Sequence, residues 1–307
     1  MKALITGITG FVGSHMSSFL LERGFDVFGL DKALNGYDKI TYFSVDITEK
    51  KRVFEAIRKS KPDFIFHFAA ISSVTACEEN KELARAVNLG GTENILSACA
   101  DNSIKARILI PSSAYVYGLP MHDSLDESHP INPSSEYGIL KVGQEKVASR
   151  FFNKDKLSVV IIRSFNHIGP NQTTGFVCSD FAKQIAEIEK GLKEPIIKVG
   201  NLESKRDFTD VRDIVKAYLL ALEKCKPNEV YNLCSGKIYS IKQILDIMLS
   251  LTEQEIKIEI DPSKTREDDI QVIRGNNSKF VRATGWEPEI PIEKTLKDLL
   301  DYWRKHT

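Results

Sequence analysis

Three signals that often decide the class of a protein are missing from this 307-residue chain. No apolar run approaches the roughly 20 residues that a membrane-spanning helix needs, so we expect no membrane contact. Lys plus Arg and Asp plus Glu both number 42, and this balance gives no electrostatic footprint for nucleic acid. The five cysteines form no CxxC pair. We therefore expect buried free thiols, no metal site and a cytoplasmic protein.

The first half of the chain does contain a regular alternation of apolar segments and helical stripes. Near-continuous apolar strands are typical of a sheet that is covered on both faces, and alternating strand–helix units indicate a doubly wound parallel sheet. The predicted strands are 2–6, 26–30, 40–45, 63–69, 106–110 and 157–163, and the predicted helices are a stripe from Val12 to Leu20 followed by 49–60, 82–101 and 134–152.

The regularity fades after Arg163, and this change predicts a second, smaller lobe. Loops, short strands and helices with Gly and Pro punctuation fill 165–202 and 236–307. A helix with its approach at 206–222 and a strand at 229–234 are expected to return to the first domain. The predicted α/β fold therefore consists of a Rossmann-type domain, 1–164 plus 203–235, and a smaller α/β substrate lobe, 165–202 plus 236–307.

A glycine-rich stretch, TGITGFVG, lies directly after the first predicted strand and opens the first helix. Gly7, Gly10 and Gly13 let backbone N–H groups approach a pyrophosphate, and the N-terminus of the helix favours the negative charge. Structural turns also use glycine, but a place between strand and helix is the one that dinucleotide binding requires. The pattern therefore predicts a dinucleotide site.

The end of the second predicted strand bears on the type of dinucleotide. Asp31 can accept hydrogen bonds from a ribose diol and would repel a 2′-phosphate. We therefore expect NAD(P)H as the cofactor, with NAD(H) favoured. Lys32 is a neighbouring cation that would tolerate a phosphate, so NADP stays an alternative. Asp46 and Ile47 follow the third strand, where they could reach an adenine edge.

The stretch SSEYGILK places Tyr137 and Lys141 four residues apart, on one face of a predicted helix. A phenol has a reference pKa of about 10, and a nearby ammonium makes it a usable proton donor or acceptor near neutrality. The same spacing is common on helix surfaces. Here it follows a strand with a serine-rich tip in a chain with a dinucleotide pattern, which favours a catalytic interpretation.

Eight stretches together carry a resemblance to a known family. They are TGITGFVG (6–13), HFAA (67–70), NLGGTENIL (88–96), SSAYVYG (112–118), ESHPINPSSEYGILK (127–141), RSFNHIGP (163–170), RDFTDVRD (206–213) and TREDDI (265–270). Over essentially its whole length, the chain resembles the nucleotide-sugar branch of the extended short-chain dehydrogenases/reductases. The resemblance implies that Tyr137 is the acid/base and that Lys141 holds the nicotinamide ribose and lowers the pKa of the tyrosine. It also implies that Ser113 hydrogen-bonds the reacting oxygen.

The same resemblance implies the binding residues and partners. Arg206 and Arg266 resemble arginines that clamp a substrate diphosphate. Asp269 resembles the acid that holds the nucleotide ribose, and Asn166 resembles a substrate-contacting asparagine. The implied partners are a nucleotide-sugar substrate, with a GDP-sugar favoured, and a second copy of the chain. The implied cofactor contacts are Gly7, Gly10, Phe11, Val12, Asp31, Lys32, Asp46, Ile47, Phe68, Ala69, Ala70, Tyr137 and Lys141.

A homodimer is the implied assembly. The helices at 82–101 and 134–152 resemble those that pair across a two-fold axis in this family. The apolar residues that could contribute, some of which must instead cover the sheet, are Ala84, Ala86, Leu89, Leu96, Ala98, Leu140, Val147 and Phe151.

The loop after Ser113 bears on the reaction. In the 4,6-dehydratases of this family, acidic residues follow the catalytic hydroxyl and take a proton from the sugar. Ala114 and Tyr115 occupy those positions here, so dehydration is disfavoured and hydride and proton exchange at one carbon remains. Segments 165–185 and 195–215 look most like the GDP-6-deoxy-D-mannose reductases, which reduce GDP-4-dehydro-6-deoxy-D-mannose to GDP-D-rhamnose.

Other activities stay open from the sequence. The main alternative is an NAD-dependent UDP- or dTDP-sugar 4-epimerase, whose loop also has Ala after the catalytic serine, as Ala114 does here. Other nucleotide-sugar reductases or dehydrogenases are further alternatives. A catalytically dead NAD(P)-binding regulator is disfavoured because such proteins typically lose the Tyr or the Lys, and both Tyr137 and Lys141 are present.

Overall fold

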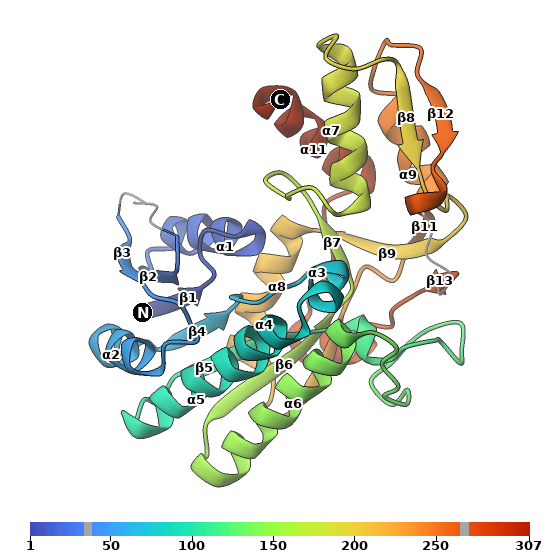
Figure 1. Ribbon diagram of the computed structural model, residues 1–307. Coiled ribbons are helices and arrows are strands. Elements are labelled where there is room, and N and C mark those ends of the chain that lie inside the picture. Colours follow the sequence, from blue (N-terminus) through green and yellow to red (C-terminus); the bar gives the residue numbers. More distant parts are fainter. Residues whose placement is uncertain (34–38, 265–269) are drawn as a thin grey trace.

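The computed structural model describes residues 1–33, 39–264 and 270–307. In it the chain forms a large sheet with helices on both faces and a smaller lobe beside that sheet (Figure 1). The large sheet contains seven parallel strands in the order β10-β6-β5-β4-β1-β2-β3. The order reverses at β1, which confirms the predicted doubly wound Rossmann-type sheet. Its strands are β1 (Lys2–Thr6), β2 (Asp26–Asp31), β3 (Thr41–Ser44), β4 (Phe64–His67), β5 (Arg107–Ser113), β6 (Ser158–Ser164) and β10 (Val230–Leu233).

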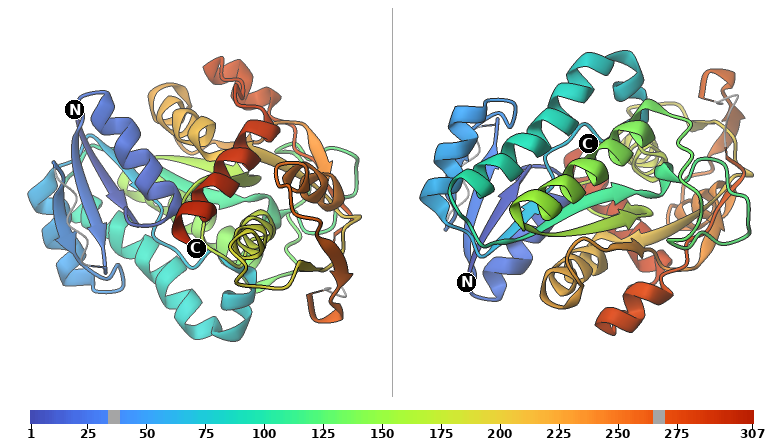
Figure 2. Two further views of the ribbon diagram at one scale, coloured as in Figure 1. Left: turned by 90° about the horizontal axis from the view of Figure 1, so that it is seen from above. Right: turned by 90° about the horizontal axis from the view of Figure 1, so that it is seen from below.

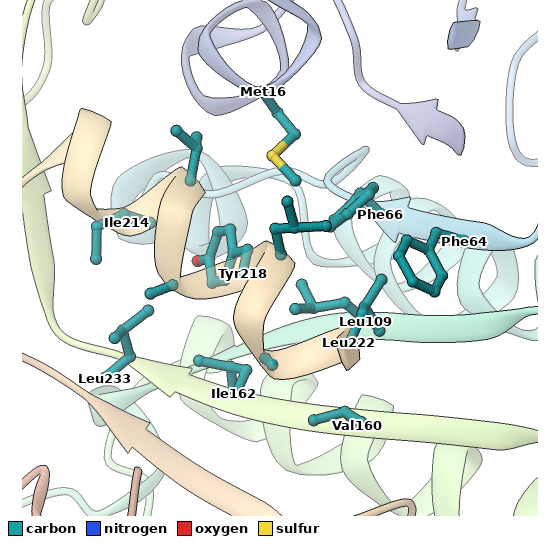
Figure 3. Packing of buried hydrophobic residues seen from close by; sticks show 14 of the residues in the cluster. Met16, Phe64, Phe66, Leu109, Val160, Ile162, Ile214, Tyr218, Leu222 and Leu233 are labelled. Carbon is teal, nitrogen blue, oxygen red and sulfur yellow. The ribbon is translucent and has the colours of Figure 1, made fainter. Parts of the chain in front are cut away.

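Alternate residues along each central strand face opposite layers of helices. In β5, Leu109 packs in one apolar cluster, whereas Ile108 and Ile110 pack in the other. Figure 3 shows the first cluster, where Met16 and Tyr218 from two helices meet Leu109 of the sheet. Helices α1 (Phe11–Glu22), α8 (Val211–Lys224) and α10 (Ser278–Thr284) cover this face, and α2 (Lys50–Ser60), α5 (Gly91–Asp101) and α6 (Glu136–Asp155) cover the other.

The smaller lobe is built on two short sheets and lies to one side of the large sheet (Figure 2). One sheet has the order β11-β9-β13, with β7 also paired to β9, and the other pairs β12 with β8. A third apolar cluster, which includes Phe181, Leu245 and Leu299, fills the space between three helices. The elements are β7 (Asn166–Ile168), α7 (Val177–Glu189), β8 (Ile196–Val199), β9 (Lys205–Asp210), β11 (Ile238–Ser240), α9 (Ile241–Leu249), β12 (Lys257–Ile260), β13 (Val272–Ile273) and α11 (Ile292–His306).

Two segments differ from the sequence expectation. Segment 82–101 is not one regular helix, because α4 (Lys81–Arg85) and α5 are joined by a π-helical turn, Ala86–Gly90. Strand β9, in the segment expected to return to the first domain, pairs instead with β7, β11 and β13 of the smaller lobe. Its partners come from distant parts of the chain, so local patterns do not reveal this pairing. Helix α8 and strand β10 do return to the large sheet.

The helices expected to form a dimer interface direct most of their apolar residues inward. Ala84, Leu96, Ala98 and Leu140 are buried within the chain itself, as is Phe151. Leu89 and Val147 are half-buried, and Ala86 is exposed. Exposed apolar side chains on these helices are Leu83 on α4 and Ile139 on α6. The homodimer stays a prediction.

Candidate active site

A cleft with a volume of about 990 Å³ lies between the large sheet and the smaller lobe. It begins where the strand order reverses at β1, the place at which doubly wound sheets bind ligands. One wall comes from the loop after β1, the ends of β2, β4 and β5, and the start of α6, and the opposite wall comes from β7, α7, β8 and β9. The two parts of the fold therefore enclose one site.

The loop after β1 forms a cradle that only glycine permits. Gly7 has a φ of +69°, and a Cβ there would lie 2.7 Å from the Ala69 nitrogen. A Cβ on Gly13 would lie 2.1 Å from the Gly7 carbonyl oxygen. Gly10 precedes α1, and no side chain caps the helix. The first N–H groups of α1 are therefore available to a phosphate, so the residues present fit a dinucleotide.

The end of β2 holds a carboxylate that is tied to the same loop. One oxygen of Asp31 accepts hydrogen bonds from the Thr9 backbone N–H at 3.1 Å and the Thr9 hydroxyl at 2.7 Å. The second, Oδ1, has only a long 3.4 Å contact from the Ala33 N–H, so it can accept from a ribose hydroxyl. Lys32 beside it is exposed. Asp31 and Lys32 both line the cleft.

The two residues that follow the third strand, Asp46 and Ile47, line the cleft near Asp31. Asp46 accepts hydrogen bonds from the backbone and hydroxyl of Thr48, and these bonds lower the pKa of its carboxyl. Ile47 is buried against Gly91, where a Cβ would lie 2.3 Å from the isoleucine side chain. Both residues thus follow the third strand and line the cleft, and their contact with an adenine stays a prediction. The predicted contacts Phe11, Val12, Phe68, Ala69 and Ala70 also line the cleft.

Ser113, Tyr137 and Lys141 meet where β5 ends against the first turns of α6, and all three line the cleft. The Lys141 ammonium nitrogen lies 5.6 Å from the centroid of the Tyr137 ring. It donates a hydrogen bond of 2.8 Å to the carbonyl of Pro111. Ser113 and Lys141 are buried, and Tyr137 is half-buried. The structure therefore brings together the three residues that the sequence selected.

Local contacts fix the start of α6 against this loop. The Ser135 side chain caps the helix by accepting from the Gly138 N–H at 3.2 Å. Gly138 lets the first turn approach closely, because a Cβ there would lie 2.6 Å from the Tyr115 carbonyl oxygen. The Tyr115 ring stands edge-on to Tyr137, with ring centroids 5.8 Å apart. The loop and the helix thus hold each other in place.

Desolvation governs the proton affinities of this cluster. It raises the pKa of the Tyr137 phenol, and a hydrogen bond with the Ser113 side chain opposes part of the rise. Burial lowers the pKa of the Lys141 ammonium to about 8, and the nearby Cys77 and Glu145 oppose part of that lowering. The expected lowering of the tyrosine's pKa is therefore wrong for this arrangement, because the ammonium donates to a backbone carbonyl and desolvation of the phenol dominates. A protonated phenol is suited to donate a proton.

The opposite wall carries the predicted substrate residues that the structure describes. Asn166 on β7 and Arg206 on β9 line the cleft. Arg206 is largely buried, with its guanidinium donating to the carbonyl of Lys205 at 3.0 Å. Arg266 and Asp269 lie outside the described residues. A cation and an amide from the smaller lobe thus line the same cleft as Ser113.

Some residues that shape the site were not selected from the sequence. Thr9 orients Asp31, and Tyr115 faces the cleft beside Tyr137. Asn88 is buried in the π-helical turn and bonds both backbone groups of Ile71, at 2.8 and 3.0 Å, which holds the loop after β4. Asn88 begins the NLGGTENIL stretch, but the π turn that contains it has no pattern in the sequence.

Other predicted features concern metals, membranes and thiols. In the described part of the chain, no group of three or more His, Cys, Asp or Glu side chains is arranged to hold a metal ion. In that same part, no helix is long and apolar enough to cross a membrane. The five cysteines are buried free thiols, as predicted.

Comparisons with known proteins agree with this geometry. The sequence matches a family model described as GDP-mannose 4,6 dehydratase over residues 4–299. It is 30% identical over 308 residues to the GDP-6-deoxy-D-mannose reductase of Pseudomonas aeruginosa, covering 98% of this chain and 97% of that protein.

Two solved structures are similar over the whole chain. One is a structure of RMD from Pseudomonas aeruginosa complexed with NADPH, with a TM-score of 0.88, 28% identity, and coverage of 100% of this chain and 99% of that one. The other is the UDP-glucose 4-epimerase of Thermus thermophilus complexed with NAD, with a TM-score of 0.89, 27% identity and complete coverage (100%) of both chains. The chain therefore belongs to the extended short-chain dehydrogenase/reductase family of nucleotide-sugar enzymes, within the group that the GDP-mannose 4,6 dehydratase model describes.

Proposed function

We propose that this protein reduces the 4-keto group of a nucleotide-linked 6-deoxyhexose with NAD(P)H, and that its substrate is GDP-4-dehydro-6-deoxy-D-mannose, giving GDP-D-rhamnose. One observation carries the proposal: Ser113, Tyr137 and Lys141 converge in the cleft, and the loop beside them presents Ala114 and Tyr115 instead of carboxylates. The similarity to the Pseudomonas aeruginosa reductase over nearly the whole chain supports this choice within the family.

The chain's own residues would divide the work at the reacting carbon. The bound nicotinamide supplies the hydride. Tyr137 donates the proton to the C4 oxygen, since the raised pKa of its phenol keeps that proton in place. The Ser113 hydroxyl hydrogen-bonds the same oxygen as negative charge develops on it. Lys141 holds the nicotinamide ribose from the turn of α6 below Tyr137.

Dehydration is a poor fit to this site. Removal of a C–H proton needs a base beside the sugar, and a carboxylate is the group that dehydratases place there. Among the described residues that line the cleft, the carboxylates are Asp31, Asp46 and Asp180. Asp31 and Asp46 lie at the end of the cleft near the glycine loop, and Asp180 accepts from the Gly175 N–H on the opposite wall. The enzyme would therefore act on a sugar that is already a 4-ketone.

The cofactor and substrate contacts follow from the two walls. Asp31 would accept from the adenosine ribose and favour NAD(H), while the exposed Lys32 would tolerate a 2′-phosphate. Arg206, together with Arg266, would hold the substrate diphosphate, because a guanidinium fork suits that anion. Asn166 would contact the sugar, and Asp269 would hold the nucleotide ribose. A homodimer formed through α4, α5 and α6 completes the proposal.

The test is a coupled reaction. GDP-mannose is first converted by a GDP-mannose 4,6-dehydratase, and this protein is then added with NADH or NADPH labelled with deuterium at the transferable position. We expect oxidation of the cofactor, a 6-deoxyhexose by NMR, and deuterium at C4 alone. Without the dehydratase, no 4-keto product should form. Cofactor oxidation with a hexose that keeps its 6-hydroxyl would contradict the substrate assignment.

A 4-epimerase is the second candidate, and two observations favour it. Asp31 suits a tightly held NAD, and the fold matches the Thermus thermophilus 4-epimerase as closely as the reductase structure. An epimerase regains its cofactor in every cycle, so the purified protein should carry NAD and convert UDP-sugars without net consumption of NADH. A reductase should instead exchange its cofactor and consume it in proportion to product.

A further inference from the structure

Three side chains in a row on α6 reach three successive residues of β5. Tyr137, Lys141 and Glu145 are spaced four residues apart, so they lie on one face of the helix. The partners of these side chains on β5 are, in the same order, Ser113, Pro111 and Ser112. Tyr137 and Lys141 line the cleft, whereas Glu145 lies behind it. The third member of the row therefore acts from outside the substrate space.

Glu145 makes three hydrogen bonds through its carboxylate. Oε1 accepts from the Ser112 hydroxyl at 2.5 Å and from Arg163 Nε at 2.9 Å, and Oε2 accepts from Arg163 Nη2 at 2.7 Å. The side chains of Arg163 and Glu145 are only 7% and 11% exposed. Ser112 and Arg163 are paired residues of neighbouring strands β5 and β6. One carboxylate thus ties α6 to two central strands at the residue just before Ser113.

The network continues away from Glu145. Arg163 Nη1 donates to the Tyr117 hydroxyl at 3.2 Å, and that hydroxyl donates to Asn232 Oδ1 on β10 at 2.6 Å. A buried ion pair is poor evidence for stability, because apolar replacements of similar volume are often neutral or stabilising. A fully hydrogen-bonded pair does, however, fix one arrangement of the elements it joins. This ion pair lies directly beside Ser113, Tyr137 and Lys141, so the arrangement it fixes includes the position of those three residues.

We propose that Glu145 is a positioning residue for this chemistry: through Ser112 and Arg163 it fixes α6 against β5, and its charge holds the Lys141 ammonium beside Tyr137. The inference rests on the roles proposed above for Tyr137 and Lys141.

Three titratable groups near Lys141 are neutral near pH 7, so none of them stabilises its ammonium by charge. Cys77 on α3 (Val74–Glu79) has a raised pKa through burial, so its thiol is neutral near pH 7. His67 on β4 has a pKa lowered to about 3, chiefly by burial, so it is neutral too. The phenol of Tyr137 also keeps its proton. Glu145, one turn further along α6 and ion-paired with Arg163, is then the acidic neighbour that opposes the burial that lowers the lysine's pKa to about 8.

The test measures the titration of Lys141 directly. The full chain is labelled with ¹³C at lysine Cε, the Lys141 resonance is identified by its loss in Lys141→Met, and its midpoint is followed by NMR with pH. We expect a fall of about one pH unit or more in Glu145→Gln, since an opposite charge nearby shifts a pKa by about 1–3 units. Glu145→Asp keeps the charge and should stay near the parent. Glu93→Gln, which removes an exposed partner of Arg150, is the matched control and should not move the midpoint.

The activity profile supplies the second readout. In Glu145→Gln, the alkaline limb of kcat should move to lower pH by the same amount, with kcat lowered more than the KM for the nucleotide sugar is raised. A purely structural role would lower the melting temperature and leave both midpoints in place. An unchanged Lys141 midpoint in folded Glu145→Gln would overturn the inference.

A double variant and a titration without substrate distinguish a failure to fold, and a failure of the proposed function, from a failure of this inference. If Glu145→Gln does not fold, the double variant Glu145→Gln/Arg163→Gln removes the unpaired guanidinium and should fold. The Lys141 midpoint should still fall there, but by less, because the repulsion from Arg163 is lost together with the attraction of Glu145. A midpoint that stays at the parental value in the double variant would equally overturn the inference. The NMR titration needs no substrate, so a shifted midpoint in a protein that reduces no 4-keto sugar would refute the proposed function and leave the role of Glu145 standing.

Discussion

The two ends of the cleft, which in the proposed function would hold the sugar and the adenosine of the cofactor, are built in different ways. At the sugar end, Ser113 and Lys141 are buried, and each is held by bonds within the β5–α6 junction. At the adenosine end, Asp31 and Asp46 are half-buried, and Lys32 is exposed. Interactions between solvent-exposed charges are weak and are screened by salt, whereas buried groups have strongly shifted pKa values. The sugar end should therefore control rate, and the adenosine end should control only preference.

The largest effect is expected from Tyr137→Phe, which tests the sugar end. Loss of the hydroxyl removes the proton donor and the bond with Ser113, so kcat should fall by about 10²–10⁴-fold. Nucleotide-sugar affinity, measured by calorimetry, should change little because the ring remains. A kcat within a few-fold of the parent would show that Tyr137 is not the proton donor, and would contradict the idea that the sugar end controls the rate.

Lys141→Met should separate activity from stability at the same end. Turnover should be lost, yet the fold should become more stable at pH 7 by about 2 kcal/mol, as urea denaturation would measure. A shift of the lysine's pKa from 10.5 to about 8 corresponds to about 3 kcal/mol against the charged form, offset by about 1 kcal/mol for the unpaired Pro111 carbonyl.

The predicted direction of this stability change can be checked by varying pH. The folded-state pKa of Lys141 lies below its unfolded value, so its burial destabilises the fold below about pH 8. That penalty disappears as pH rises toward the unfolded value of 10.5. The stability gain of Lys141→Met should therefore vanish near this upper limit. A gain that does not vary with pH would show that packing, not desolvation, is responsible.

Asp31→Ala tests the adenosine end and should have a smaller effect. The carboxylate's repulsion of a 2′-phosphate is lost, so the ratio of kcat/KM for NADH over NADPH should fall by about tenfold, with kcat nearly unchanged. Initial rates with both cofactors measure this. A parent enzyme that already prefers NADPH strongly would show that Lys32 overrides the carboxylate.

Asp46→Asn should have the smallest effect. The amide oxygen can still accept both hydrogen bonds from Thr48, so the loop is kept and only a partly exposed charge is lost. The KM for the cofactor should change by less than about fivefold, because exposed charge contacts contribute about 0.2–1 kcal/mol. A change as large as that of Asp31→Ala would mean that the adenosine end depends on Asp46 as much as on the ribose contact.

The sequence by itself determined the large sheet, the glycine cradle and the placing of Tyr137 and Lys141 on one face of a helix. Near-continuous apolar runs on β1, β4, β5 and β6 encode a sheet covered on both faces in a local pattern, and the four-residue spacing of Tyr137 and Lys141 encodes a shared helix face. Asp31 was identifiable because it ends the second strand, beside the glycine loop that follows the first. Each of these features depends on residues close together in the chain.

Only the tertiary structure decided the features that join distant segments. The pairing of β9 with β7, β11 and β13 could not be predicted, because the residues of a short strand do not specify which distant strand it will pair with. The raised pKa of Tyr137 likewise arises from desolvation by several elements, and it reversed the expectation drawn from Lys141 alone. Glu145 looked like an ordinary helix residue until folding set its carboxylate between Ser112 and Arg163, because burial and charge pairing are properties of the packed molecule and not of the local sequence.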